Sequence, residues 1–353
     1  MTQERGDAPL DKVHVNLVCE VCDGTQSSPW RTLRYPQFQH PGTFALRRCD
    51  GCGLVYNSPR LDGDALARLY DRNYYIFNEP VPAAFERVVG LYRATVARLE
   101  ARLQPGDGRR LLEVGSAKGY MLALLRDRGW QAEGVELSGH AASFAERTLQ
   151  APTFHGTLEA WVERPGHLPH PAAYCTDVIE HVPSPLRFVE TLYRALQPGA
   201  LVLIGTPNVD SDGVREHGEH WLGFNPFHIW LFSRQTLSRL LDRCGFDVIE
   251  AWTFGNVQLE REPEVGTAKR WLRDTLGRTG LLGPLRSLRS RGQSEVSATK
   301  VATLRAEAAR QMNEGTPWAD SADGRHPRAA SAKGDNLVIL ARRRADPAPP
   351  SEP

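Results

Sequence analysis

A short apolar run leads directly into a glycine-containing turn at residues 111–119, Leu-Leu-Glu-Val-Gly-Ser-Ala-Lys-Gly. A strand that ends in such a turn and continues into an amphipathic stretch, here 120–128, is typical of units that bind nucleotide-like ligands, because glycine lets a ligand approach the backbone. Glu136 ends the next predicted strand, about 20 residues after Gly115, where a carboxylate can accept hydrogen bonds from both hydroxyls of a ribose. These residues therefore predict a nucleotide-type cofactor site.

Short apolar runs alternate with amphipathic stretches through the rest of this region, which predicts an α/β fold with a mostly parallel sheet covered on both faces. The predicted strands are 111–114, 132–137, 153–155, 172–178, 201–206, 246–252 and 336–342, and the predicted helices are 120–128, 140–149, 185–196 and 233–244. A further helical stripe covers 83–103, and Pro105 and Gly106 end it.

Two residues distinguish between classes of nucleotide ligand. Ala117 stands where a dinucleotide-binding turn has its middle glycine, and Glu113 lies on the strand before the turn. A carboxylate at that position would repel a pyrophosphate, whereas it can bind the ammonium group of a methionine moiety. Glu113 therefore favours an S-adenosylmethionine-like cofactor over a dinucleotide, and a glycine turn with no ligand is the remaining alternative.

Six short motifs follow in order along the chain, at 113–119, 134–136, 177–183 (Asp-Val-Ile-Glu-His-Val-Pro), 196–199, 206–208 and 334–338. With them, residues 110–257 and 335–342 resemble the class I S-adenosylmethionine-dependent methyltransferases. The resemblance implies a Rossmann-like sheet of seven strands, of which the last is antiparallel. It also implies that the cofactor contacts Glu113, Gly115 and Gly119 around its methionine part, Glu136 at the ribose, the turn at 156–158 with Thr157 and Leu158 beside the adenine, and Thr176 at the sulfonium end. Ser116, Leu137 and Asp177, next to these positions, are further candidate cofactor-binding residues.

Four of the 6 cysteines form two close pairs, Cys19/Cys22 and Cys49/Cys52, each with a glycine inside it or just after it. Two such pairs predict a tetrahedral four-sulfur site with no open position, which is typical of structural zinc. Rubredoxin-like iron is the alternative. A domain of about 45 residues has a small core, so the metal should supply much of its stability.

The zinc ribbon and the segment after it carry a second resemblance. Residues 52–60, together with Tyr70, Tyr74 and Tyr75, resemble the N-terminal region of deoxysugar C-methyltransferases and related small-molecule methyltransferases. The ribbon could cover the substrate, dock a carrier or partner, or brace the core.

Glu180 and His181 follow the fourth predicted strand, at the sheet edge where ligands bind in open α/β folds. His181 is the first candidate for a general base, with a helix-capping role as its alternative. His228, in an aromatic and histidine-rich stretch at 220–230, is the second candidate. Asp177, Glu180 and His181 also resemble the divalent-metal site of ubiquinone-pathway O-methyltransferases, where Mg²⁺ could lower the pKa of a phenol.

The chain has 353 residues and a net charge of +1, which does not favour a general nucleic-acid binder. The absence of a long apolar run or a secretory signal, together with the paired cysteines, predicts a cytoplasmic location with no transmembrane segment. We expect a disordered segment at 1–14, a zinc ribbon at 15–60, a helical linker at 61–109 and the core at 110–257 and 334–343. We also expect a basic helical insertion at 258–333 and a disordered tail at 344–353.

The resulting hypothesis is methyl transfer from S-adenosylmethionine to an oxygen or carbon atom of a small-molecule biosynthetic intermediate. The intermediate could be a free small molecule, a nucleotide-sugar or a molecule bound to a carrier. One alternative is an RNA methyltransferase. The other is a non-catalytic, cofactor-binding partner protein that docks through the ribbon and the basic insertion. The oligomeric state is not predicted.

Overall fold

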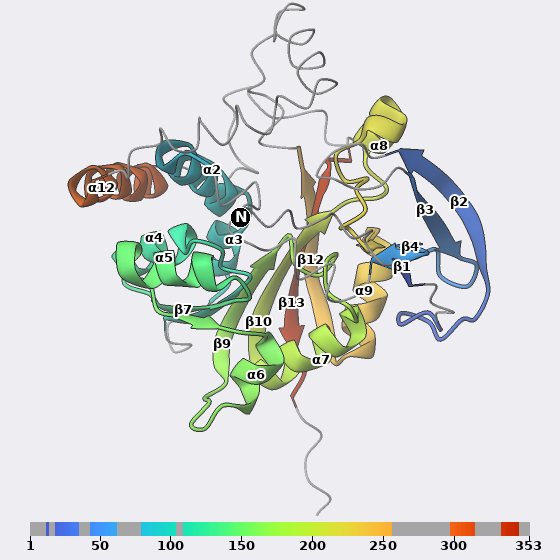
Figure 1. The fold of residues 1–353 in the computed structure, drawn as a ribbon. Helices are drawn as coiled ribbons and strands as arrows, with labels where there is room; N and C mark the ends of the chain where they lie inside the picture. The colour runs from blue at the N-terminus through green and yellow to red at the C-terminus, as the bar shows by residue number, and fades with distance from the viewer. Residues whose placement is uncertain are drawn as a thin grey trace, which may run out of the picture.

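The structure is a computed structural model that describes residues 12–13, 18–34, 43–61, 79–103, 109–255, 297–314 and 333–345. Its centre is a seven-stranded sheet in the order β12-β13-β10-β9-β6-β7-β8 (Figure 1). The strands are β6 (Arg110–Val114), β7 (Gln131–Glu136), β8 (Thr153–His155), β9 (His170–Thr176), β10 (Leu196–Pro207), β12 (Phe246–Phe254) and β13 (Asn336–Arg343). The strands from β10 to β8 are parallel, and β13 runs antiparallel between β10 and β12. The predicted Rossmann-like topology is confirmed.

Helices cover both faces of this sheet. Successive residues of a strand point to opposite faces, and in the central strands the residues on both faces are apolar. On β10, Leu201 and Leu203 pack with one set of helices, whereas Val202 and Ile204 pack with the other. The first set is α2 (Val81–Ala94), α3 (Val96–Glu100), α4 (Tyr120–Asp127), α5 (Gly139–Leu149) and α12 (Ala298–Glu314). The second set is α6 (Leu158–Glu163), α7 (Pro185–Ala195) and α9 (Arg234–Arg243). No described helix is long and apolar enough to cross a membrane.

Serine and threonine residues begin several of these helices. The side chains of Ser138, Thr157, Ser184 and Ser233 each accept a hydrogen bond from the first turn of α5, α6, α7 and α9. At Ser233 the bond is reciprocated by Thr236, which forms a capping box. The caps of α5, α6 and α7 fix the points at which the chain leaves the carboxyl ends of β7, β8 and β9, and hence the loops that build the site.

A second sheet contains the cysteine region. Strands β2 (Ser27–Arg34), β3 (Thr43–Cys49) and β4 (Val55–Asn57) are antiparallel, and β11 (Trp230–Leu231) pairs with β4 as the fourth strand. The short strands β1 (Lys12–Val13) and β5 (Arg60–Leu61) form a separate pair. The stretch leading to β11 contains α8 (Asp212–His217) and the 3₁₀ turn η2 (Gly218–His220). The ribbon is therefore completed by a strand from the core region.

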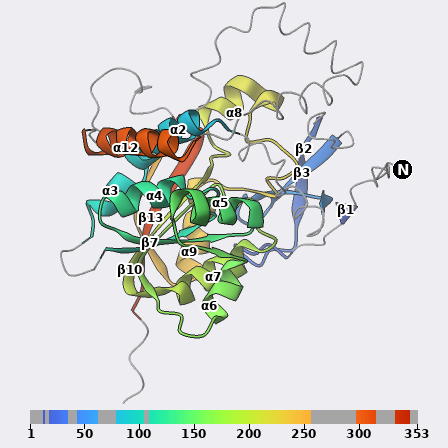
Figure 2. The same ribbon diagram turned by 60° about the vertical axis from the view of Figure 1, so that its left-hand side comes forward.

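The ribbon and α12 lie on opposite sides of the central sheet in both views (Figures 1 and 2). α12 is the described part of the expected basic insertion, and it packs on α2 and α4 through Val301, Ala308 and Met312. The remaining insertion residues 258–296 and 315–332 lie outside the described part, as do 1–11, the tail from 346, Tyr70, Tyr74 and Tyr75.

Several local features differ from the predicted elements. The helix expected at 83–103 is interrupted at Thr95, whose φ of −134° and ψ of −81° are not helical. Helix α6 and strand β11 were not predicted. A six-residue helix and a two-residue strand are too short to show a hydrophobic period, so hydrophobic spacing could not predict them.

Candidate cofactor and metal sites

The turn between β6 and α4 has three residues in the left-handed region of backbone space: Gly115 at φ +76°, Ala117 at +47° and Gly119 at +73°. A Cβ atom at Gly119 would lie 2.7 Å from the Cβ of Ala145, and one at Gly115 would overlap Val178. The two glycines are therefore required both by backbone conformation and by close packing. Val178, in the segment after β9, packs against Gly115, so the predicted motifs at 113–119 and 177–183 are in contact.

Glu113 presents a buried carboxylate beside this turn. It is 6% exposed, and its Oε2 has no hydrogen-bond partner among the described residues. Burial and the nearby charge of Glu136 raise the pKa of Glu113 well above its ordinary value, while Arg87 acts in the opposite direction. The hydroxyls of Ser116 and Tyr120 also lack hydrogen-bond partners within the described structure. Unsatisfied buried groups of this kind are costly, so this cluster is suited to a polar or cationic ligand.

Glu136 holds two loops together at the end of β7. Its Oε2 accepts a hydrogen bond from the Ala117 backbone N–H at 2.8 Å, and its Oε1 accepts one from the Ser138 N–H at 2.6 Å. Each carboxylate oxygen can accept a further bond, so these contacts leave capacity for ribose hydroxyls. The next residue, Leu137, is 48% exposed at the same edge. An exposed leucine beside a buried carboxylate offers an apolar surface to a flat ring.

The other predicted cofactor residues also lie at the carboxyl ends of strands. Thr157 follows β8 and caps α6, whereas the Leu158 side chain is buried in the core, so a ligand would meet Leu158 at its backbone. Thr176 ends β9, and its hydroxyl lies 3.1 Å from that of Tyr174. Asp177 follows with φ +55° and an exposed side chain. Every predicted cofactor residue therefore lies along one edge of the sheet, across the neighbouring strands β9, β6, β7 and β8.

Glu180, His181 and His228 bring one potential ligand atom each to within 4.8 Å of one another. Glu180 is fully buried, and its Oε2 accepts a 2.9 Å hydrogen bond from the hydroxyl of Thr206 on β10. Its other oxygen, Oε1, lies 3.8 Å from His181 Nε2 and has no hydrogen-bond partner in the described structure. Asp177 is not part of this group, so the predicted set of Asp177, Glu180 and His181 is not the one that the structure gathers.

Backbone carbonyls orient the two imidazole rings. His181 Nδ1 lies 2.9 Å from Phe227 O, and His228 Nδ1 lies 2.8 Å from Gly223 O. A carbonyl can only accept, so in each ring Nδ1 carries the proton and Nε2 carries the lone pair. Burial lowers the pKa of His181 to about 4, and burial together with His181 lowers the pKa of His228 to about 3. Both rings are therefore neutral at physiological pH.

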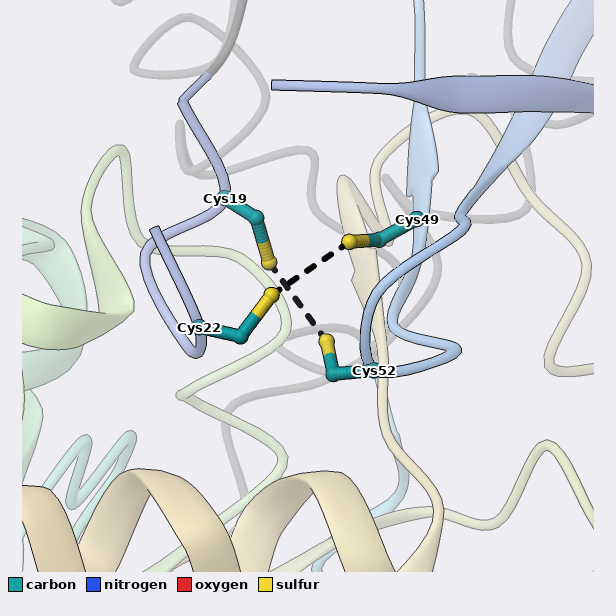
Figure 3. A group of neighbouring side chains, drawn as sticks. All are labelled: Cys19, Cys22, Cys49 and Cys52. Atoms are coloured by element: carbon teal, nitrogen blue, oxygen red, sulfur yellow. Dashed lines mark hydrogen bonds between the residues drawn. The ribbon is translucent and has the colours of Figure 1, made fainter. Parts of the chain in front are cut away.

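The four paired cysteines converge as expected (Figure 3). The Sγ atoms of Cys19 and Cys52 are 3.6 Å apart, and those of Cys22 and Cys49 are 3.5 Å apart. These distances are too long for disulfides, and they are close to the separation of about 3.8 Å that a tetrahedron with Zn–S bonds of about 2.3 Å requires. The donor set therefore fits a four-thiolate zinc ion.

The ribbon contacts the core through polar residues that the sequence prediction did not identify. Glu20, between the first two cysteines, accepts hydrogen bonds from the Ser184 hydroxyl at 2.8 Å and the Leu186 N–H at 3.1 Å, at the start of α7. The Asn57 side chain donates to Pro226 O at 3.1 Å, two residues before His228. No sequence pattern marks Glu20 or Asn57, because each contact joins segments more than 160 residues apart.

Comparisons with known proteins agree with this geometry. Residues 85–251 match the family described as "Methyltransferase domain". A protein of Mycolicibacterium smegmatis, named "Probable S-adenosylmethionine-dependent methyltransferase", is 30% identical over 148 residues, which cover 40% of this chain and 53% of that protein. A ubiquinone biosynthesis O-methyltransferase of Leptothrix cholodnii is 30% identical over 115 residues, covering 29% of this chain and 46% of that enzyme.

A tRNA U34 carboxymethyltransferase of Chromohalobacter salexigens is 28% identical over 174 residues, covering 42% of this chain and 48% of that protein. The chain thus spans about half the length of these curated relatives. Among solved structures, a SAM-dependent methyltransferase from Archaeoglobus fulgidus aligns with a TM-score of 0.46 and 16% identity, over 76% of this chain and 99% of that one.

Proposed function

From the premise that this chain carries an S-adenosylmethionine-dependent methyltransferase domain, we propose that it transfers a methyl group to an oxygen or carbon atom of a small-molecule acceptor. The observation that carries the proposal is the buried Oε2 of Glu113, which has no hydrogen-bond partner among the described residues and lies beside the glycine turn. The ammonium group of the cofactor's methionine moiety would supply the missing donor and the missing positive charge.

The residues around Glu113 fit the remaining parts of the cofactor. Glu136 retains acceptor capacity for the ribose hydroxyls, and Leu137 offers its exposed side chain to the adenine. Ser116 contributes a hydroxyl beside the same turn, with no hydrogen-bond partner in the described structure. Placed in this way along the sheet edge, the cofactor would direct its sulfonium toward Thr176 and Asp177, after β9.

The bound cofactor supplies an activated methyl group, and the protein must orient the acceptor and deal with its proton. Glu180, His181 and His228 are the groups that we assign to the acceptor's proton. Glu180 and His181 follow β9, and His228, in the stretch before β11, belongs to the same group. Val178, which also follows β9, packs against the glycine turn, so this group is next to the predicted sulfonium end. Neutral imidazoles with their lone pairs on Nε2 suit that task.

The named function of the Leptothrix cholodnii relative supports a small-molecule acceptor. The tRNA-modifying relative supports RNA as the second candidate acceptor. Retention of the chain on RNA, with a steep dependence on salt concentration, would favour the second candidate.

Calorimetric titration with S-adenosylmethionine tests the proposal through Glu113→Gln. We expect the affinity to fall at least tenfold, because a charge-assisted contact is lost, about 1.4 kcal/mol or more. In the absence of cofactor, the same variant should be as stable as the wild type or more stable, because it no longer buries an unpaired carboxylate.

Glu146→Gln is the matched control, since Glu146 is exposed on α5 and should change neither quantity. Equal affinities of Glu113→Gln and wild type would contradict the cofactor assignment. If the cofactor binds as expected, a screen for turnover should begin with phenols and nucleotide-sugars.

A further inference from the structure

We propose that the cysteine ribbon positions the acceptor-proton group, which is the set Glu180, His181 and His228, and that Glu20 and Asn57 are its two positioning residues. Each residue holds one of the two chain segments from which the group is assembled. The positioning follows from the contacts of these residues, whereas its part in methyl transfer rests on the proposed function.

The acceptor-proton group is divided between two segments. Glu180 and His181 lie in the turn between β9 and α7, whereas His228 lies in the stretch before β11. The two rings pack edge to face, with their centroids 4.7 Å apart. His228 also bonds within its own segment, through Nδ1 to Gly223 O at 2.8 Å and through its backbone N–H to Asn225 Oδ1 at 2.9 Å. The relative position of the two segments therefore decides how the rings meet.

The first knuckle of the ribbon, residues 19–22, contacts the first segment. The Oε2 atom of Glu20 accepts hydrogen bonds from the Ser184 hydroxyl at 2.8 Å and from the Leu186 N–H at 3.1 Å. Ser184 is the N-cap of α7 and comes three residues after His181. A carboxylate at the start of a helix is stabilised by the partial positive charge of the backbone N–H groups there. Glu20 thus fixes the point at which the turn enters α7.

The second knuckle, residues 49–52, leads into β4, which contacts the second segment. Asn57 ends β4 and is 1% exposed. Its side chain donates to Pro226 O at 3.1 Å, and its backbone N–H donates to Ile229 O at 3.0 Å. These two carbonyls lie on either side of His228 in the chain, so Asn57 holds the segment at both ends.

Strand β11 joins the two segments to each other. The backbone N–H of Trp230 donates to Glu180 O at 3.2 Å, and its indole N–H donates to Val182 O at 2.8 Å. Ile179 and Ile229, which are sequence neighbours of the group, belong to the same buried apolar cluster as two of the ribbon cysteines. A displacement of either knuckle would therefore be transmitted to the group. Functional side chains keep their geometry only when the contacts behind them are fixed in this way.

Asp23 separates a positioning role from general stabilisation. It follows the first knuckle, and it pairs at 2.9 Å with Arg243, the last residue of α9. Asp23 thus links the ribbon to the core, as Glu20 does, but it links it to neither of the two segments. If the ribbon only stabilised the fold, the loss of either carboxylate would affect the acceptor-proton group equally.

Nuclear magnetic resonance of the full, zinc-loaded chain with labelled histidine rings tests this inference. We expect a nuclear Overhauser cross-peak between the rings of His181 and His228, each assigned from its own glutamine variant. Glu20→Ala should reduce this cross-peak by more than half, because its intensity falls steeply with distance. Glu20→Gln should restore it, since the amide oxygen can accept from the same two donors. Asp23→Ala is the matched control, and it should behave as the wild type.

Asn57→Ala tests the second segment independently and should also weaken the cross-peak. A wild-type chain without the cross-peak, or wild-type intensity in both Glu20→Ala and Asn57→Ala, would overturn the inference. Equal losses in Glu20→Ala and Asp23→Ala would do the same. So would loss of zinc from Glu20→Ala, because Glu20 would then act on the ribbon and not on the turn.

Calorimetry with S-adenosylmethionine on the same samples separates this inference from the proposed function. Glu20→Ala should bind the cofactor as the wild type does, because Glu20 is not among the predicted cofactor residues. A wild-type chain that gives the cross-peak but binds no cofactor refutes the methyltransferase function and leaves the positioning. Cofactor binding together with a cross-peak that neither substitution changes refutes the positioning alone.

Discussion

Ala117 is the residue at which the glycine turn is strained. Its φ of +47° costs an L-residue about 1–2 kcal/mol, which glycine avoids. Replacing Ala117 with glycine relieves this strain, but it also increases the conformational freedom of the unfolded chain, which lowers stability by a smaller amount. We therefore expect Ala117→Gly to raise the free energy of unfolding by a net amount of about 0.5–1 kcal/mol. Urea unfolding of the ligand-free protein measures the difference.

The matched control is Ala302→Gly, at an exposed position in α12, where the same change should lower stability by about 1 kcal/mol. A destabilised Ala117→Gly variant would show that the methyl group of Ala117 contributes packing that outweighs the backbone strain.

At this scale the sequence predicts where the residues of a local motif lie, and it misses partners that the fold brings together. Glu113 and Glu136 could be predicted because a strand, a turn and a fixed spacing place them. The association of His228 with Glu180 could not be derived, because the hydrogen bond from Asn57 to Pro226 and the pairing of β11 with β4 position the segment around His228. The predicted alternative, Asp177, is nearer to Glu180 in sequence but is outside the group.

Among the elements, α12 makes several of its polar contacts with the core through one of its own arginines, Arg305, beside its packing through Val301, Ala308 and Met312. Arg305 donates to both carboxylate oxygens of Asp127 at 2.7 Å, and to Leu149 O at 2.7 Å and Ala123 O at 3.0 Å. We expect Arg305→Ala to lower the free energy of unfolding by about 1–3 kcal/mol and to increase hydrogen exchange throughout α12.

Arg310→Ala is the control in the same helix. Arg310 is exposed and pairs only with Glu307 and Glu314 among the described residues, both on α12 itself, so its loss should leave the free energy of unfolding nearly unchanged. Equal exchange of α12 in the two variants would contradict the attachment through Arg305.

Glu133 joins β7 to β9 and to the end of α6. Hydrogen bonds from His170 and from Arg164 lower its pKa to about 2. Between pH 4.5 and pH 2 the unfolded chain therefore binds more protons than the folded one, so stability is lost as the pH falls through this range.

Glu133→Gln should reduce this acid sensitivity and should lower stability at pH 7 by about 2 kcal/mol, after allowance for partial solvent screening. Urea midpoints at pH 7 and at pH 3 measure both effects, with Glu146→Gln as the exposed control. Parallel pH dependence in Glu133→Gln and the wild type would exclude Glu133 as the source.

Elements with several turns or a clear apolar run could be predicted from the sequence, as β6, β7, α5 and α9 illustrate. The interruption at Thr95 was missed because the apolar stripe continues across it, with Tyr92, Val96 and Leu99 all buried. Hydrophobic spacing reports which side of a helix is buried, and it is insensitive to one non-helical residue.

For the whole molecule, the four-cysteine site is expected to stabilise regions beyond the ribbon. Removal of zinc by a chelator should increase hydrogen exchange at 18–34 and 43–57, because this small unit has little core of its own. Exchange should also increase at 226–231, since Asn57 and β4 hold that segment. The interior strands β6, β9 and β10 should keep their protection.

Adding zinc back is the control, and it should restore the original exchange pattern. Full protection of 226–231 in the zinc-free chain would show that the core alone holds this segment in place.

The two units could be predicted separately from their cysteine and glycine motifs, but their shared strand could not. Contacts such as that of Glu20 with Ser184 depend on how two independently patterned regions meet, and neither pattern contains that information.

The completion of the ribbon sheet by β11 has a consequence for biosynthesis. The cysteines leave the ribosome long before Trp230 and Leu231 are made, so β4 must wait with an unpaired edge while most of the central sheet is translated. An exposed strand edge of this kind invites pairing with other chains. Early capture of zinc by the nascent chain would hold β3 and β4 in register during that interval, which would give the metal a protective role before synthesis of the chain is complete.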